Sequence, residues 1–120
     1  MIDETRPIFF QIAERIENDI IAGAIAEESQ VPSTNEFAAF YRINPATAAK
    51  GVNLLVDDGI IYKKRGIGMF VSHGAKAQLV LKRRRQFFEQ FIKPMMAEAQ
   101  KLGIEAQDLA EMIRKGEDKS

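Results

Sequence analysis

The sequence contains no cysteine and no tryptophan, and its only histidine is His73. Without cysteine the chain can form no disulfide bond and offers no thiol to catalysis or to a metal ion. A transition-metal site would have to gather carboxylates around that one imidazole, and no second ligand lies near it in the sequence. Asp57 and Asp58 are neighbours at the end of a predicted helix, so their side chains project differently and make a poor catalytic pair. We therefore expect neither enzymatic activity nor a metal or cofactor.

Long apolar runs are also absent: none approaches the ~18 residues that a membrane-spanning helix needs. Residues 1–6 contain two acidic side chains, which is the wrong composition for the start of a secretory signal. Together with the lack of cysteine, these features favour a cytoplasmic protein with no membrane partner. The 120 residues suffice for one domain, or for a small domain with a helical extension.

An excess of either charge is lacking too, because 17 basic side chains balance 17 acidic ones. The overall charge therefore gives no indication of a nucleic-acid partner. The two parts of the chain differ, however, since residues 1–74 carry a net charge of −3 and residues 75–120 a net charge of +3. The sequence leaves open whether one basic run contacts DNA, a partner subunit or only solvent. That run is Lys82, Arg83, Arg84 and Arg85.

Two amphipathic helices are predicted in the N-terminal part. Isoleucine recurs every four residues from Ile8 to Ile20, which gives a helix over residues 7–22 a single apolar stripe. Ser33 and Glu36 have the spacing of a capping box, in which each side chain binds the backbone amide of the other residue, so a second helix should begin there. We expect the buried face of that helix to consist of Phe37, Ala38, Phe40 and Tyr41.

A third helix and a hairpin should follow. Asn44 is a favourable N-cap and Pro45 suits the first helical position, so the helix should run to about Asp58. Gly51 is expected to allow close packing against the preceding helix, and the inward face is Ala48, Val52, Leu55 and, at its edge, Val56. Two β-rich runs, residues 60–64 and 69–72, flank Arg-Gly-Ile-Gly and predict a β-hairpin with a tight turn. This order of elements is that of a winged helix-turn-helix.

The C-terminal part is predicted to be a helical tail. A long helix should cover about residues 76–102, with Pro94 kinking it or ending it early, and a short helix should cover about residues 105–114. The fold class is therefore mainly α with a small β-hairpin: a winged helix-turn-helix over residues 1–74 and a two-helix tail over residues 75–120. The tail carries more apolar side chains than one helix can bury against a small domain, which favours a dimer interface, although packing against the last helix would use some of them. The predicted interface residues are Leu79, Phe87, Phe88, Phe91, Ile92, Met95, Met96, Leu109, Met112 and Ile113.

The predicted DNA-reading surface lies on the third helix and the hairpin. The second helix of a helix-turn-helix enters the major groove, so its early amides could receive a phosphate and Asn53 could pair with adenine. Lys50 could reach guanine or a phosphate, or simply be solvated. Arg65 at the hairpin tip suits a narrow minor groove. The predicted DNA contacts are Ser33, Thr34, Asn35, Asn44, Pro45, Ala46, Thr47, Ala49, Lys50, Asn53, Lys63, Lys64, Arg65, Gly66 and Gly68.

Three characteristic blocks lie within residues 7–71: PIFFQIAERIENDIIAGAI, VPSTNEFAAFYRINPATAAKGVNLLVDDGII and YKKRGIGMFV. In combination they resemble the GntR family of bacterial transcription regulators. The INPATAAKG form of the third helix, followed by a short tail, is similar to the YtrA-like branch of that family. The resemblance implies a two-helix tail used mainly for dimerisation, no large effector-binding domain, and in many cases repression of operons for ATP-driven transporters.

The chain also departs from the pattern of the family. Most members have arginine at the positions of Asn35, Pro45 and Ala49, whereas Ser33, Thr47, Lys50 and the tip Arg65-Gly66 with Gly68 match. The resemblance thus implies a homodimeric, sequence-specific DNA-binding regulator, a repressor acting on a palindromic double-stranded operator, but not which operator. The competing interpretation is a winged-helix module that binds another protein, which the net charge of −3 favours. A small-molecule effector is left open.

Overall fold

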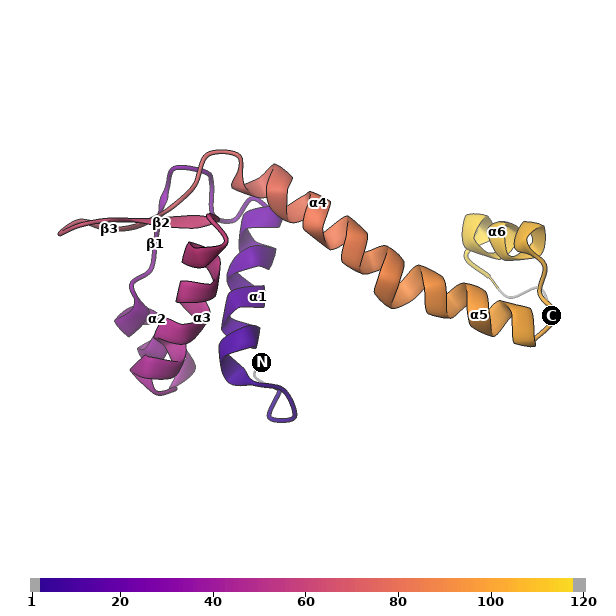
Figure 1. The fold of residues 1–120 in the computed structure, drawn as a ribbon, viewed down its shortest axis with the longest axis horizontal. Coiled ribbons are helices and arrows are strands. Elements are labelled where there is room, and N and C mark those ends of the chain that lie inside the picture. The colour runs from indigo at the N-terminus through magenta and orange to yellow at the C-terminus, as the bar shows by residue number, and fades with distance from the viewer. Residues whose placement is uncertain (1–2, 118–120) are drawn as a thin grey trace. The chain divides into compact units, whose positions relative to one another are not determined.

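The structure, a computed structural model, describes residues 3–117 of the chain. These residues form two compact units, which meet between Leu81 and Lys82 and are described separately below. The elements follow the predicted order, with one further strand (Figure 1). Their bounds are α1 Ile8–Ile21, β1 Gln30–Val31, α2 Thr34–Tyr41, α3 Pro45–Asp57, β2 Ile61–Lys64, β3 Gly68–Val71, α4 Ala75–Phe87, η1 Phe88–Ile92, α5 Lys93–Lys101 and α6 Ala106–Lys115.

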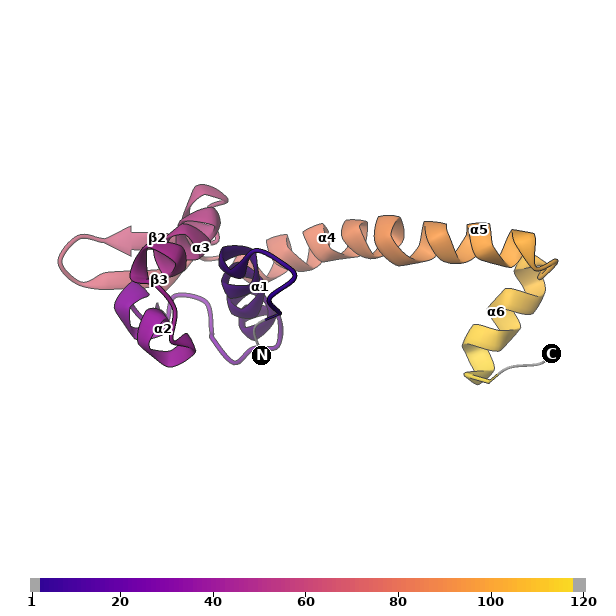
Figure 2. The ribbon, with the colours of Figure 1, turned by 90° about the horizontal axis from the view of Figure 1, so that it is seen from below.

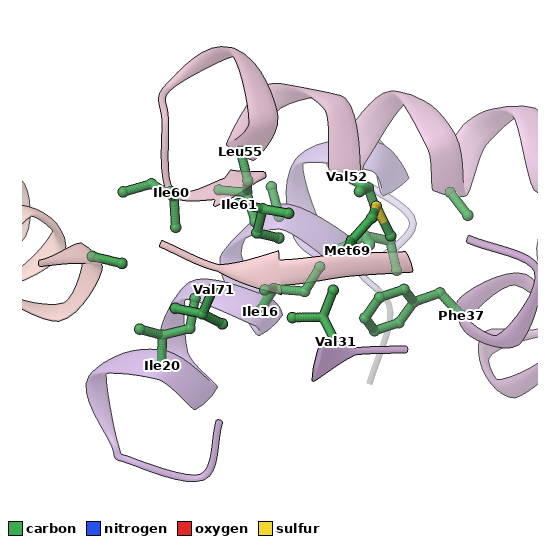
Figure 3. Packing of buried hydrophobic residues seen from close by; sticks show 14 of the residues in the cluster. Ile16, Ile20, Val31, Phe37, Val52, Leu55, Ile60, Ile61, Met69 and Val71 are labelled. Atoms are coloured by element: carbon green, nitrogen blue, oxygen red, sulfur yellow. The ribbon is translucent and has the colours of Figure 1, made fainter. Parts of the chain in front are cut away.

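The core of the first unit lies between α1, α3 and the sheet. The predicted isoleucine stripe is buried, with Ile12, Ile16 and Ile20 each only 1% exposed. Figure 3 shows Ile16 and Ile20 of α1 beside Val52 and Leu55 of α3 and the strand residues that complete the cluster. Burial of these side chains removes apolar surface from water, at about 25 cal/mol for each Å². Packing between these elements therefore fixes the position of α3.

Gly51 allows the close approach of two helices, although the partner is α1 and not the preceding helix, as the sequence suggested. A Cβ atom at Gly51 would lie 2.6 Å from the backbone oxygen of Phe9 and 3.1 Å from Cβ of Ile12. No side chain fits at those distances without a shift of backbone. Glycine is a poor helix former, but at this position it allows α1 and α3 to pack in direct contact.

The helix-turn-helix is formed by α2 and α3. Both hydrogen bonds of the predicted capping box are present, from the amide of Glu36 to Ser33 Oγ and from the amide of Ser33 to Glu36 Oε1. Arg42 ends α2 in the left-handed conformation at φ 56°. The prediction for Phe40 was wrong, because its side chain is 76% exposed at the end of a short helix whose inward positions are already filled by Phe37 and Ala38.

The sheet has three antiparallel strands in the order β1-β3-β2. β2 and β3 form the predicted hairpin, with Tyr62 opposite Phe70 and Lys63 opposite Met69. The added strand, β1, is two residues of the link between α1 and α2, and it pairs with β3. Figures 1 and 2 show the hairpin extending away from the helices, so the tip of the wing is open to a partner.

The tail helix begins in the first unit, where Ala75 and Leu79 are each 1% exposed. Within the second unit, the helix does not end or break at Pro94. A π-helical turn, η1, precedes the proline, and in it the amide of Lys93 donates to the carbonyl oxygen of Phe88. A proline clashes with the carbonyl four residues before it, and the wider turn moves that carbonyl away. The chain then turns at Gly103, with φ 71°, into α6.

Candidate nucleic-acid interface

The first turn of α3 is capped as predicted, but its amides already have acceptors. Asn44 Oδ1 accepts from the amide of Ala46 at 2.7 Å, and the amide of Thr47 lies 3.0 Å from the carbonyl oxygen of Asn44. Pro45 has no N–H to offer. The expectation of unpaired amides at this helix start therefore has to be corrected, since a phosphate here would have to share or displace the Asn44 side chain. The hydroxyl of Thr47 and the exposed methyl of Ala46 remain on the same turn.

Two longer side chains of α3 have partners from other elements. The ammonium of Lys50 lies 4.1 Å from the ring centroid of Phe9 in α1, within the range of a cation–π contact. Asn53, two turns into the helix, accepts a hydrogen bond from Lys63 Nζ of β2 at 3.2 Å. The structure thus brings two of the predicted contacts, Asn53 and Lys63, into one cluster between α3 and the wing. Ala49 is half-buried on this helix.

The two lysines of β2 lie on opposite faces of the hairpin. Lys63 lies on the face that contacts α3. The ammonium of Lys64 lies on the outer face, 4.7 Å from the ring centroid of Phe70 and 5.9 Å from that of Tyr62. Tyr62 donates from its hydroxyl to Glu28 Oε2 at 2.9 Å, and this bond raises the pKa of the phenol. The outer face is therefore an aromatic surface with one cation held against it.

The tip of the wing is braced by Gln30 of β1. Gln30 Nε2 donates to the carbonyl oxygen of Ile67 at 3.1 Å. The same side-chain amide fills the space that a Cβ atom at Gly68 would occupy. Gly66 takes φ 77°, the left-handed region that glycine adopts without strain. Arg65 is exposed beside it. The brace fixes the backbone that carries this guanidinium.

The start of α2 contributes the remaining predicted contacts of the first unit. The Ser33 hydroxyl accepts from the amide of Glu36. The amide of Ser33 in turn binds Glu36, which lowers the pKa of that carboxyl, and the hydrogen bond of the Ser33 hydroxyl to the carboxyl helps to lower it. Asn35 is exposed and Thr34 is half-buried.

The tail residues predicted for a dimer interface divide into two sets. Leu79 is 1% exposed in the core of the first unit, so it is not available to a partner, and that prediction was wrong because the first turns of α4 belong to the first unit. In the second unit the rings of Phe87 and Phe91 are 5.6 Å apart and more than half exposed. Phe88, Met96 and Ile113 are also exposed, and Ile92, Met95, Leu109 and Met112 are half-buried.

Sequence reasoning missed the residues that hold the interface in place. Phe9, Gln30 and Glu28 contact Lys50, the wing tip and Tyr62 through side chains from distant parts of the chain. Gly68 could have indicated that another side chain packs against the wing tip, because a second glycine in so short a turn is typical of a close neighbour. Nothing in the sequence pairs Gln30 with that glycine.

Among residues 3–117, no helix combines the length and apolar character that crossing a bilayer requires. Within the same range, no three metal-ligating side chains gather in a way that could hold an ion.

Residues 10–71 match the family described as bacterial regulatory proteins, gntR family. The chain belongs to the GntR family. It is 32% identical over 108 residues to the HTH-type transcriptional repressor YtrA of Bacillus subtilis, an alignment that covers 90% of this chain and 82% of YtrA. It is 33% identical over 66 residues to the repressor NagR of the same organism, which covers 55% of this chain and 27% of NagR. The predicted likeness to the YtrA-like branch is confirmed.

Solved structures of GntR-type regulators share the fold. A GntR-family regulator from Bacteroides thetaiotaomicron superposes with a TM-score of 0.76 at 35% identity, covering 90% of this chain and 94% of that one. The DNA-binding domain of AraR, in complex with operator ORX1, superposes with a TM-score of 0.54 at 29% identity, covering 59% of this chain and 87% of that one. This GntR-family chain is thus a winged helix-turn-helix transcription regulator and not an enzyme.

Proposed function

We propose that this GntR-family chain is a homodimeric cytoplasmic repressor that binds a palindromic operator, with residues 1–74 binding DNA and residues 75–120 holding the dimer. The observation that carries the proposal is the surface formed by α3 and the braced wing, where Asn53 and Lys63 meet. The AraR domain, which shares this fold, is bound to an operator in its own structure. The likeness to YtrA supports repression, and the family resemblance suggests a transporter operon as the target.

The wing supports DNA as the partner despite the net charge of −3 in residues 1–74. Lys63, Lys64 and Arg65 gather at the hairpin, whereas Glu27 and Glu36 are engaged by backbone amides of other segments. One carboxylate, that of Glu28, accepts from the hydroxyl of Tyr62 on the hairpin. A local concentration of cations determines phosphate binding more than the total charge does. In the proposed complex Arg65, at the exposed tip, would enter the minor groove.

The second unit supports a dimer. The aromatic rings of Phe87 and Phe91 and the side chain of Met96 are each more than half exposed, and Phe88 is nearly so. A cluster of this kind is costly to leave in water and marks a protein–protein contact. With one reading unit on each subunit, a two-fold dimer would match a palindromic site.

A gel-shift titration against DNA upstream of the chain's own gene, at several salt concentrations, tests DNA binding. We expect a complex whose affinity falls steeply with salt, because each neutralised phosphate releases counterions. Arg65→Ala should weaken binding to all fragments by a similar factor, with an unchanged melting temperature. If no fragment from that region is bound at any salt concentration, the proposal fails and the protein-binding alternative takes its place.

A further inference from the structure

The hydrogen bond between Lys63 and Asn53 fixes which way the asparagine amide faces. Lys63 Nζ lies 3.2 Å from Asn53 Oδ1, and an ammonium can only donate, so the amide oxygen has to face it. Both side chains are exposed. What the pair presents outward is therefore the NH₂ group of Asn53 and the remaining N–H groups of Lys63, all of which are donors.

This set of donors does not suit adenine, the base that the sequence suggested for Asn53. The adenine edge presents the N6 amino donor beside the N7 acceptor, so bidentate pairing needs the asparagine oxygen as an acceptor. Here that oxygen already accepts from a charged donor, which would repel the N6 amino group. A phosphodiester presents acceptors only and carries a negative charge, so every outward group of the pair can donate to it in charge-assisted hydrogen bonds.

The position of the pair agrees with a phosphate as well. Asn53 belongs to α3, the helix expected in the major groove, and Lys63 belongs to β2, in the wing expected on the backbone or the adjacent minor groove. One sugar-phosphate strand separates neighbouring grooves, so it would run across the place where these two elements meet. The base of the hairpin lies next to α3 (Figures 1 and 2), and the hydrogen bond joins the two elements there.

We propose that Asn53 and Lys63 act together as a clamp on one backbone phosphate of the operator, at the strand between the two grooves. Asn53 then contributes to affinity and register and not to base choice, because phosphate contacts carry no sequence information directly. The inference rests on the proposed function, since it assigns a role within the same DNA complex.

The test compares Lys63→Met and Asn53→Ala with the wild type and with a control, Lys101→Met, which removes an exposed lysine from α5 in the second unit. Each protein selects sequences from a random duplex pool and is then titrated on the wild-type selected site at several salt concentrations. We expect Lys63→Met to reduce the slope of log affinity against log salt by about 0.9, the value for one phosphate. Asn53→Ala should bind more weakly with the slope nearly unchanged, and both variants should select the wild-type sequence.

A second measurement locates the phosphate. Methylphosphonate linkages, which are neutral, are placed one at a time along the selected site. A methylphosphonate at one position should strongly reduce the DNA affinity of the wild type and of the Lys101→Met control. The same linkage should leave the affinity of Lys63→Met almost unchanged, because that variant has already lost the contact. Melting temperatures of all variants should match the wild type, since both side chains are exposed.

The outcomes separate this inference from the function on which it rests. If the wild type selects no sequence, the proposed function fails. If the wild type selects a site and Asn53→Ala changes the preferred base at one position, Asn53 reads a base and the clamp is overturned. A Lys63→Met variant that keeps the full salt slope and is sensitive to the same linkages as the wild type would also overturn it.

Discussion

At the scale of single residues, Gly51 allows α1 and α3 to approach closely because it has no side chain. A Cβ atom there would meet a backbone oxygen, that of Phe9, at 2.6 Å, and a backbone atom cannot move aside as the end of a flexible side chain can. The ring of Phe9 in turn lies under the ammonium of Lys50. One glycine thus influences both the core and a predicted DNA contact.

We expect Gly51→Ala to destabilise the first unit although alanine is the better helix former. Alanine gains about 1 kcal/mol in helix propensity, whereas overpacking against the backbone of α1 costs about 1–3 kcal/mol, so the net loss should be about 1 kcal/mol. Urea unfolding followed by circular dichroism measures it. Asn53→Ala on the same helix is the control, with a change within about 0.5 kcal/mol. A more stable Gly51→Ala protein would contradict this account of the helix contact.

At the scale of elements, Glu27 connects the link before the sheet to the start of α4. Its two carboxylate oxygens accept from the amides of Gly74 at 2.9 Å and Lys76 at 3.1 Å. These hydrogen bonds lower the pKa of the Glu27 carboxyl, and the bond from Gly74 has the largest effect. The nearby charges of His73 and Lys76 lower it as well. A negative charge at a helix N-terminus is also favoured by the helix dipole.

The lowered pKa gives this contact a predictable dependence on pH. Because the carboxyl is more acidic in the folded state, its stabilising effect is complete above the unfolded value of about 4.3 and is lost as the pH falls through the folded value. Glu27→Gln should therefore melt at a lower temperature than the wild type at pH 7, with the difference shrinking in acid. Glu4→Gln, at an exposed residue before α1, is the matched control. A difference in melting temperature that is the same at pH 7 and in acid would exclude the charged cap as its source.

Local signals were sufficient to predict most elements, and long-range contacts were not predictable. The capping box, the Asn44 cap and the glycine turn depend on residues within a few positions of one another, so their spacing in the sequence determines them. The pairs Lys50–Phe9, Gln30–Ile67 and Lys63–Asn53 join residues from different elements, and their geometry arises only once the core has packed. The π-helical turn is intermediate, because Pro94 indicated a disturbance but not how the backbone would absorb it.

At the scale of the whole molecule, the DNA-binding surface of one subunit is small, so tight binding should require a second subunit. The α3 helix lacks the arginines that are common in its family, and its first amides are already paired. One such unit should bind DNA weakly. Joining two units makes the second binding event intramolecular, and this effective concentration can raise affinity by about 10²–10⁴-fold without any new contact. Tight binding is therefore expected to depend on the tail.

We expect Phe91→Ser to separate the two effects. Phe91 is 60% exposed in the second unit and lies beside Phe87 with the rings tilted, so the substitution should weaken the dimer without disturbing the core of the first unit. Light scattering should then give the mass of one chain, and affinity for a two-half-site duplex should fall by about 10²-fold towards that for a single half-site. Phe40→Ser, which removes a phenylalanine that is 76% exposed on α2, should leave the mass of the dimer unchanged. A wild-type mass of one chain, or a monomeric Phe91→Ser that keeps full affinity for the two-half-site duplex, would show that binding does not depend on the tail.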